Sequence, residues 1–277
     1  MHPAQVQLVP GDGRVLGPLL CASPDTRIIS FTGGQLTGQA IARVAGVKKL
    51  LLELGGVCPT IVMPSADLDV AVQRIVSGAF WAAGQNCLHV QRVIVHEQVF
   101  SRFRDRVLDA TMRLRQGPKS DPRTDVGPLR GPSAIGRACE QLRDAIEQGG
   151  TVLCGGRPFG AGLEPTWVEL PEPRGRLVHE EAFCPISTLE PVRSMSHALS
   201  KAAVSGSAIQ AGVFTNALDE ARQAMAELNA GAVLINECSD FRADAMPFGG
   251  PGTSGLGREG VRFAAEAYSE PKLVCVC

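Results

Sequence analysis

Residues 26–56, TRIISFTGGQLTGQAIARVAGVKKLLLELGG, contain the pattern that decides the fold. A β-type run over residues 26–32 leads into the Gly33-Gly34 turn, a helical pattern covers residues 35–45, and a second apolar run covers residues 49–54. A strand, a helix and a further strand in this order form a unit whose two strands are parallel. We therefore expect an α/β protein built on parallel sheets.

The same alternation continues along the rest of the chain. We predict helices at residues 68–84, 99–114, 132–148, 196–204 and 218–228, and strands at residues 92–96, 151–154, 167–170, 186–192, 211–215 and 232–236. Residues 247–260 are too rich in glycine for a regular element and are expected to form a surface loop. Residues 273–277 are expected to form an edge strand, for which a partner subunit is one possible cover.

Composition narrows the class of protein. The chain has 277 residues, of which 44% are hydrophobic, enough for a sizeable core. A net charge of -1 gives no support for binding to nucleic acid or to an anionic membrane surface. No apolar run approaches the length of a membrane span, and Met1-His2-Pro3 does not begin a secretion signal, so we expect a cytoplasmic protein acting on small molecules.

The cysteines indicate neither a metal site nor a disulfide framework. Nine cysteines are scattered along the chain without a C-x-x-C pair, and the histidines are not clustered. We therefore predict no metal, and reduced thiols in a reducing compartment.

Three short motifs contain the candidate chemical groups. Cys87 lies in Gly84-Gln85-Asn86-Cys87, just after a predicted buried helix, where a cysteine is either a nucleophile or a small buried hydrophobe. Glu53 ends an apolar strand, which favours a raised pKa and a role as a base, although an exposed strand-end acid is also common. Gly33-Gly34 opens a helix whose free amides favour a pyrophosphate, and a turn without any ligand has the same pattern.

The order of these and two later motifs, FTGG, ELGG, GQNC, EEAFCP and MPFGG with SGLGREG, resembles the aldehyde dehydrogenase superfamily over essentially the whole chain. The resemblance is to the C-terminal portion of that family. It implies oxidation of an aldehyde to a carboxylic acid with NAD or NADP. It also implies a remnant of a Rossmann-like cofactor domain at residues 1–55, a catalytic domain at 56–250, and a return segment with an oligomerisation strand at 251–277.

The resemblance also implies roles for single residues. Cys87 would be the nucleophile that passes through a thiohemiacetal and a thioester, and Glu53 would activate the water that hydrolyses the thioester. Gly33, Gly34, Glu181 and Phe183 would bind the cofactor, with Glu181 on the ribose and Phe183 near the nicotinamide. Cys184 replaces a glycine of the family motif, which puts a side chain where the backbone needs freedom.

Two further residues are candidates for substrate binding. Phe248 would border the aldehyde pocket, and a plain core role is the alternative. Arg242 would meet a carboxylate or phosphate on the substrate, while an ordinary surface arginine is the commoner outcome.

The family's oxyanion-hole asparagine lies upstream of the first motif, and this chain begins too late to include it. Two hypotheses therefore stand. The first is an aldehyde dehydrogenase, acting as a homo-oligomer if the complete protein is longer. The second is a truncated pseudoenzyme or interaction subunit without oxidation activity, with a residual thiol esterase between the two.

Overall fold

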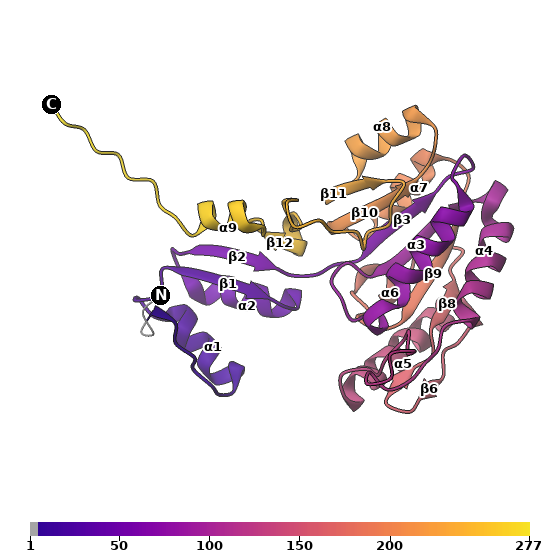
Figure 1. Cartoon of the computed structure of the whole chain (residues 1–277), viewed down its shortest axis with the longest axis horizontal. Helices are drawn as coiled ribbons and strands as arrows, with labels where there is room; N and C mark the ends of the chain where they lie inside the picture. Colours follow the sequence, from indigo (N-terminus) through magenta and orange to yellow (C-terminus); the bar gives the residue numbers. More distant parts are fainter. Residues whose placement is uncertain (1–4) are drawn as a thin grey trace.

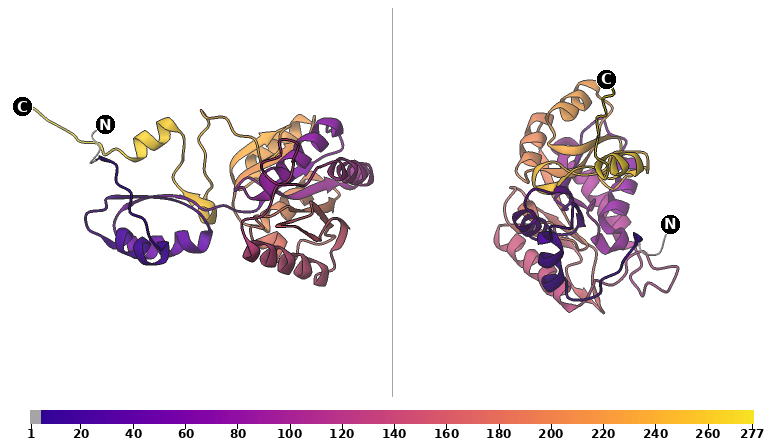
Figure 2. Two further views of the ribbon diagram at one scale, coloured as in Figure 1. Left: turned by 60° about the horizontal axis from the view of Figure 1, so that its bottom comes forward. Right: turned by 90° about the vertical axis from the view of Figure 1, so that its left-hand side faces the viewer.

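The computed structural model describes residues 5–277, so the expected absence of a secretion signal at Met1-His2-Pro3 lies outside the described residues. Two lobes lie side by side, and the chain crosses from the smaller to the larger after β2 (Figure 1). The left view of Figure 2 shows the same division from another direction. Each lobe is built on a sheet of its own.

The smaller lobe contains the βαβ unit expected from residues 26–56. Strands β1 (Ile28–Thr32) and β2 (Lys49–Glu53) are parallel, and helix α2 (Gln35–Ala45) connects them. Helix α1 (Gly13–Ala22) lies beside α2, and β12 (Gly255–Leu256) returns from the end of the chain to pair antiparallel with β2. The C-terminal segment therefore completes the first lobe.

The larger lobe is a seven-stranded sheet in the order β11-β10-β3-β4-β9-β8-β5, parallel except where β5 meets β8. This confirms the predicted α/β class. The strands are β3 (Cys58–Val62), β4 (Val90–His96), β5 (Thr151–Cys154), β8 (Thr166–Glu169), β9 (Ile186–Val192), β10 (Ala208–Phe214) and β11 (Ala230–Ile235). The small β6 (Pro158–Phe159) and β7 (Gly162–Leu163) form a separate hairpin.

Helices cover both faces of this sheet, because successive side chains of a strand point to opposite sides. Val62 and Val95 pack on the face covered by α3 (Leu68–Phe80), α4 (Glu97–Met112), α5 (Pro132–Glu147) and α6 (Arg176–His179). Ile61 and Ile94 pack on the other face, under α7 (Met195–Ala203) and α8 (Leu218–Glu227). The central strands are thus buried on both sides, as parallel strands usually are.

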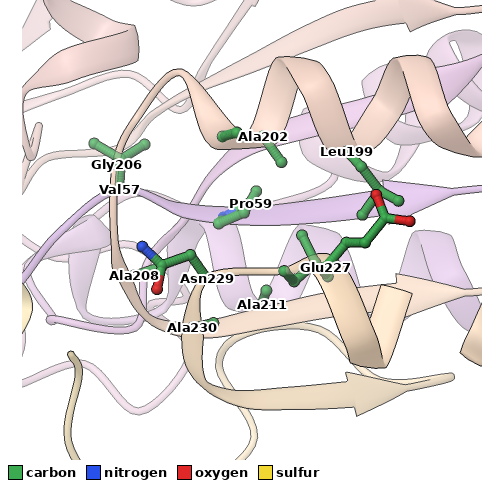
Figure 3. Close-up of a pocket in the computed structure, with 12 residues that line it drawn as sticks. Val57, Pro59, Leu199, Ala202, Gly206, Ala208, Ala211, Glu227, Asn229 and Ala230 are labelled. Carbon is green, nitrogen blue, oxygen red and sulfur yellow. The ribbon is translucent and has the colours of Figure 1, made fainter. Parts of the chain in front are cut away.

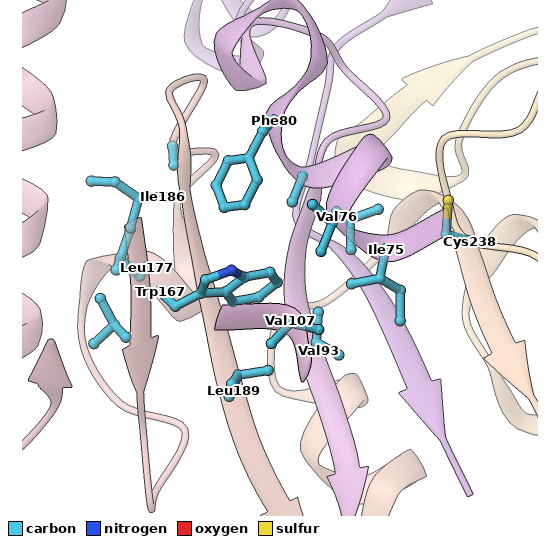
Figure 4. Packing of buried hydrophobic residues seen from close by; sticks show 14 of the residues in the cluster. Ile75, Val76, Phe80, Val93, Val107, Trp167, Leu177, Ile186, Leu189 and Cys238 are labelled. Atoms are coloured by element: carbon cyan, nitrogen blue, oxygen red, sulfur yellow. The ribbon is translucent and has the colours of Figure 1, made fainter. Parts of the chain in front are cut away.

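The larger of the two cores is centred on Trp167 (Figure 4). Its ring meets that of Phe80 edge to face, with ring centres 5.5 Å apart, and its indole N–H donates to the hydroxyl of Thr111 at 2.8 Å. Phe80 is the last residue of α3, so this contact fixes the point from which the chain turns towards Cys87.

A small pocket on the opposite face is shown in Figure 3. It lies among Val57, Pro59, Ala202 and Ala208 and has a volume of about 20 Å³. A space of that size holds a single water and no larger ligand. The chemistry of this protein must therefore be sought elsewhere.

Several elements differ from the sequence-based expectation. Strand β3 and helices α1 and α9 (Val261–Ala267) were not predicted, although β3 is an interior strand of the large sheet. The glycine-rich residues 247–260 are not a plain loop, because they contain a short 3-10 turn, η3 (Gly252–Ser254), and strand β12. Residues 273–277 join no sheet within the chain and extend away from the lobe (Figure 1).

Cys275 and Cys277 lie two residues apart in the C-terminal segment. The sulfur atoms of Cys275 and Cys277 lie 3.6 Å apart, so both side chains face the same way. Pairing of this segment with a second subunit stays a prediction, as do the domain boundaries at residues 55 and 250.

A buried ion pair gives the first testable prediction. Arg92 donates two hydrogen bonds to Glu190, at 2.7 and 2.6 Å, and both side chains are fully buried. Replacing Glu190 by alanine leaves a buried guanidinium unpaired and should lower the free energy of unfolding by about 3–5 kcal/mol. Urea titration measures the loss. The exposed pair Arg193–Glu97 is the control, since Arg193→Ala should change stability by about 0.5 kcal/mol or less.

Candidate active site

The loop that holds Cys87 has an unusual backbone. After α3, Ala82, Ala83 and Gly84 all take left-handed conformations, with φ of 51°, 55° and 66°. Gly84 cannot be replaced at no cost, because a Cβ there would lie 2.3 Å from the carbonyl oxygen of Cys184. The chain is strained over this turn, and strain of this kind gathers at functional sites.

Hydrogen bonds from Gln85 hold the turn in place. Its side-chain amide donates to the carbonyl oxygens of Ala82 and Pro128, both at 3.2 Å, and its carbonyl oxygen accepts from the amide of Arg130 at 2.8 Å. Asn86 accepts from the amide of Leu88 at 2.9 Å. The loop is therefore fixed before any ligand binds, and it leaves Cys87 half-buried.

Glu53 is the last residue of β2 and faces the crossing between the lobes. It is 7% exposed, its carbonyl oxygen accepts from the amide of Gly33 at 2.9 Å, and its Oε2 has no partner. Burial raises the pKa of this carboxyl to about 7, with a further rise from the charge of Glu259. Arg258 and Arg242 oppose that rise. A carboxyl of this kind is half ionised at neutral pH, which suits a general base.

Glu181 lies next to the crossing, with its carboxyl beside Gly55. A Cβ on Gly55 would lie 2.6 Å from its Oε1, so the glycine is needed for this close approach, and φ of 67° at Gly55 is also glycine-like. Burial raises the pKa of Glu181 to about 7, against a lowering by the amide of Gly56. Its Oε1 is buried without a partner, which makes it ready to accept from a ligand hydroxyl.

The structure brings Cys87 to these two carboxyls. Burial raises the pKa of the Cys87 thiol to about 11, and the negative charges of Glu181 and then Glu53 add to the rise, while Arg242 lowers it. At neutral pH the group is therefore a thiol in the resting protein, and not the thiolate that a nucleophile requires. Glu181 and Glu53, the two carboxyls whose charges act on the thiol, are the candidate acceptors for its proton.

Arg242 and Phe248 lie together at this site. The guanidinium carbon of Arg242 is 4.0 Å above the centre of the Phe248 ring, an arrangement that holds a cation over an aromatic face. Arg242 also contacts Glu259 at 3.4 Å, across the pair of backbone hydrogen bonds that joins Glu259 to Phe248. Phe248 itself is buried with Cys58 and Leu88 in a cluster against which Cys87 packs.

A cleft of about 350 Å³ opens beside these groups. Its walls include Glu53, Arg242, Arg258 and Glu259. Sequence reasoning missed Arg258 and Glu259, although both lie in the quoted SGLGREG motif. Their charges act on Glu53, so the end of the chain tunes a group carried by β2.

The cofactor candidates divide into two groups. Gly33 and Gly34 lie at the start of α2; a Cβ on Gly33 would meet the Phe31 ring at 2.5 Å, whereas Gly34 has open space around it and does not require glycine. Phe183 is 42% exposed with φ of 49°. The backbone freedom needed in this motif therefore belongs to Phe183, and Cys184 fits as a buried core residue.

A larger apolar cleft of about 940 Å³ lies between α1, β1 and α2, with Leu20, Ile28 and Ile41 among its lining residues. The sequence motifs do not indicate this cleft, because helix α1 was not predicted. It adjoins the start of α2, where Gly33 and Gly34 lie.

Comparison with known proteins agrees with this geometry. The family model described as the aldehyde dehydrogenase family matches residues 2–274, and the chain belongs to that family. This confirms the resemblance drawn from the motifs.

The chain is 44% identical over 274 residues to aspartate-semialdehyde dehydrogenase 1 of Pseudomonas canavaninivorans, covering 99% of this chain and 58% of that protein. Among solved structures it is similar to glyceraldehyde-3-phosphate dehydrogenase of Methanocaldococcus jannaschii in complex with NADP, with a TM-score of 0.91, 35% identity and coverage of 94% and 57%. It is also similar to aldehyde dehydrogenase 21 of Physcomitrella patens in complex with succinate, with a TM-score of 0.87, 31% identity and coverage of 92% and 53%. The chain thus spans a little over half the length of these relatives.

Two kinds of feature are absent from residues 5–277. No helix in this range is long and apolar enough to cross a membrane. The same residues contain no group of three or more histidine, cysteine or acidic side chains arranged to hold a metal ion.

The raised pKa of Cys87 can be tested directly. Because only the thiolate reacts with iodoacetamide, alkylation of Cys87 should be slow at pH 7 and should quicken up to about pH 11. Glu181→Gln should shift the profile to lower pH, since it removes a negative charge. Peptide mass spectrometry follows the site, and Cys87→Ser is the control. An apparent pKa below 8 in the protein without cofactor would contradict this account of the resting thiol.

Proposed function

We propose that this protein is an NAD- or NADP-dependent aldehyde dehydrogenase that uses Cys87 as nucleophile and Glu53 as base. The observation that carries the proposal is the convergence of one half-buried thiol and two carboxyls with raised pKa values at the crossing between the lobes. Groups with such shifts, gathered beside a cleft, are typical of catalytic sites.

The chemistry starts with loss of the Cys87 proton to a neighbouring carboxylate. The sulfur then adds to the aldehyde carbon and gives a thiohemiacetal, from which a hydride can leave because the carbon has become tetrahedral. Loss of the hydride leaves a thioester on Cys87. Bound NAD or NADP supplies the hydride acceptor.

The residues present fit such a cofactor. The unpaired Oε1 of Glu181 is an acceptor for a ribose hydroxyl, and the free amides at the start of α2, beside Gly33 and Gly34, favour a pyrophosphate. Phe183, which is exposed on the same segment as Glu181, would lie near the nicotinamide. The apolar cleft between α1 and α2 has room for the adenine.

Hydrolysis of the thioester is the role of Glu53. At neutral pH about half of its carboxyls are ionised, and the ionised form takes a proton from water as the water attacks the thioester carbon. The carboxylic acid then leaves and Cys87 is restored. The fraction of Glu53 that is ionised at a given pH depends on the charges of Arg258, Arg242 and Glu259.

Arg242 suggests which aldehydes are taken. Its guanidinium is aligned on Phe248 at the edge of the cleft with Glu53, where it would pair with a carboxylate or phosphate at the far end of a short substrate. Aspartate semialdehyde, glyceraldehyde 3-phosphate and succinate, named for the three relatives above, each carry a carboxylate or phosphate group. We therefore favour small anionic aldehydes over neutral ones.

The proposal also includes an oligomeric state and a location in the cell. The exposed C-terminal residues 273–277 would pair with a second subunit in a homo-oligomer. The nine free cysteines are in keeping with a cytoplasmic protein.

A second candidate function is hydrolysis of esters without a cofactor. Cys87 and Glu53 suffice for an acyl intermediate and its hydrolysis, so an ester would be cleaved even if no oxidation took place. An inert interaction subunit would show neither activity. Assays of aldehyde oxidation and ester cleavage on one preparation therefore separate the three cases.

Glu53→Gln provides the main test of the mechanism. Acylation of Cys87 should persist as a burst of reduced cofactor, while steady turnover falls about 10²- to 10⁴-fold because the water loses its base. In the unaltered protein, turnover should rise with pH through about 7 as Glu53 loses its proton, and that limb should vanish in the variant. Stopped-flow absorbance measures both phases.

Cys87→Ala is the matched control for this test, since it should abolish the burst as well as turnover. Full oxidation by Cys87→Ala would sink the proposed function.

Arg242→Leu tests the choice of substrate. A hydrogen bond to a charged group contributes about 1.5–3 kcal/mol, so the KM for succinate semialdehyde should rise about 10- to 100-fold. The KM for propionaldehyde should change little, because that substrate has no anion to pair. Equal effects on both substrates would argue that Arg242 is only structural.

A further inference from the structure

A hydrogen bond joins the nucleophile loop to the loop that carries Arg242. The indole N–H of Trp81 donates to Oδ1 of Asp240 at 2.6 Å, across a long stretch of sequence. Trp81 is the first residue after α3 and precedes the left-handed turn to Cys87. Asp240 lies two residues before Arg242, so the bond connects the two parts of the proposed site.

Trp81 is more exposed than a tryptophan that only fills the core. Its side chain is 48% exposed, whereas Trp167 is fully buried in the core. A large aromatic residue left half in solvent gains little from burial. The feature that distinguishes Trp81 is its N–H group and the carboxylate that accepts from it.

The segment 238–242 is held against the nucleophile loop by other contacts as well. The hydroxyl of Ser239 donates to the carbonyl oxygen of Leu88 at 2.9 Å, and the Gln210 amide donates to the carbonyl oxygens of Ser239 and Phe241 at 2.7 and 2.8 Å. A Cβ on Gly78 would lie 2.9 Å from Cβ of Asp240, so α3 and this segment are in close contact. Among these contacts, the bond from Trp81 is the one made to the carboxylate of Asp240.

Arg242 stands where two clefts meet. It lines the 350 Å³ cleft that contains Glu53. It also lines a second cleft of about 320 Å³, between Gln73, Arg74 and Ser77 of α3 on one side and residues 237, 238 and 240–242 on the other. The guanidinium of Arg242 contacts the Phe248 ring and Glu259, while its backbone belongs to the 238–242 segment that contains Asp240. What fixes Asp240 therefore helps to fix the position of this charge.

We propose that Trp81 is a positioning residue, whose bond to Asp240 holds Arg242 in place to receive the anionic end of a short aldehyde and so sets the preference for anionic substrates. This inference rests on the proposed function. Trp81 does not touch the reacting atoms in this role. It acts through Asp240 on the place of the Arg242 charge.

Trp81→Phe removes the N–H donor and keeps an aromatic ring. In the protein at its natural length, with NAD or NADP, the KM for succinate semialdehyde should rise about fivefold or more. The kcat for propionaldehyde should stay within about twofold, because neither Cys87 nor Glu53 is altered. A purely structural role would instead change both substrates alike.

Two variants of Asp240 provide the rescue test. Asp240→Asn keeps an oxygen that accepts from Trp81 and should largely retain the preference for succinate semialdehyde, whereas Asp240→Ala should lose it. The double variant Trp81→Phe with Asp240→Ala should be no worse than Asp240→Ala alone, since both remove one bond. Gln223→Ala, which removes a distant surface hydrogen bond to Ser196, is the matched control.

Amide hydrogen exchange gives a readout that does not need turnover. In Trp81→Phe, the amides of residues 239–243 should exchange faster while those of β4 remain protected. Unchanged exchange there, or an unchanged ratio of KM values for the two aldehydes, overturns the inference. If the unaltered protein oxidises neither aldehyde, the proposed function fails, and exchange alone then decides whether Trp81 fixes this segment.

Discussion

The crossing of the chain from one sheet to the other, at Glu53-Leu54-Gly55-Gly56, is the constraint on which the site depends. One end of this short segment belongs to β2 and the other leads into β3, an interior strand of the large sheet. Within it, Glu53 presents its carboxyl to the cleft, and Gly55 lets Glu181 approach the backbone. Any side chain at Gly55 would push apart the groups that the crossing brings together.

Burial at the crossing raises the pKa values of two carboxyls and of a thiol, with opposite consequences for their reactivity. It raises the pKa values of Glu53 and Glu181 to about 7, where each can exchange a proton at neutral pH. The same burial, with the charges of those carboxyls, raises the pKa of Cys87 and disfavours the thiolate. Such a site disfavours the thiolate in the resting protein, so under the proposed mechanism proton transfer within the site would have to accompany attack on the substrate.

The sequence predicted the elements whose local pattern is strong. The unit of β1, α2 and β2 and the strand at 186–192 match well, because apolar runs with clear turns mark them. Helix α1 was missed because Gly13, Gly17 and Pro18 all oppose a helix, and it forms through packing on α2. Strand β3 was missed because Pro59 and the glycines before it resemble a loop, although burial on both faces makes it a strand.

The sequence predicted candidate residues for the site but not the connections between them. Short motifs pointed to Cys87, Glu53, Glu181 and Phe248, whose roles stay predictions. Contacts between distant segments left no local trace: the approach of Glu181 to Gly55 and the bond from Trp81 to Asp240 arise only when the chain has folded. The edge strand expected at residues 273–277 does not form within residues 5–277, because the sequence gives this segment a tendency to pair but not the identity of a partner.

The smaller lobe has a consequence for the protein as a solute. Among the described residues, strand β1 pairs on one side only, and the apolar cleft beside it opens between α1 and α2. An unpaired strand edge next to an apolar groove makes this side of the smaller lobe prone to association. Self-association of this polypeptide therefore depends on what covers that side. Aggregation can begin at a temperature where every helix and strand is still folded.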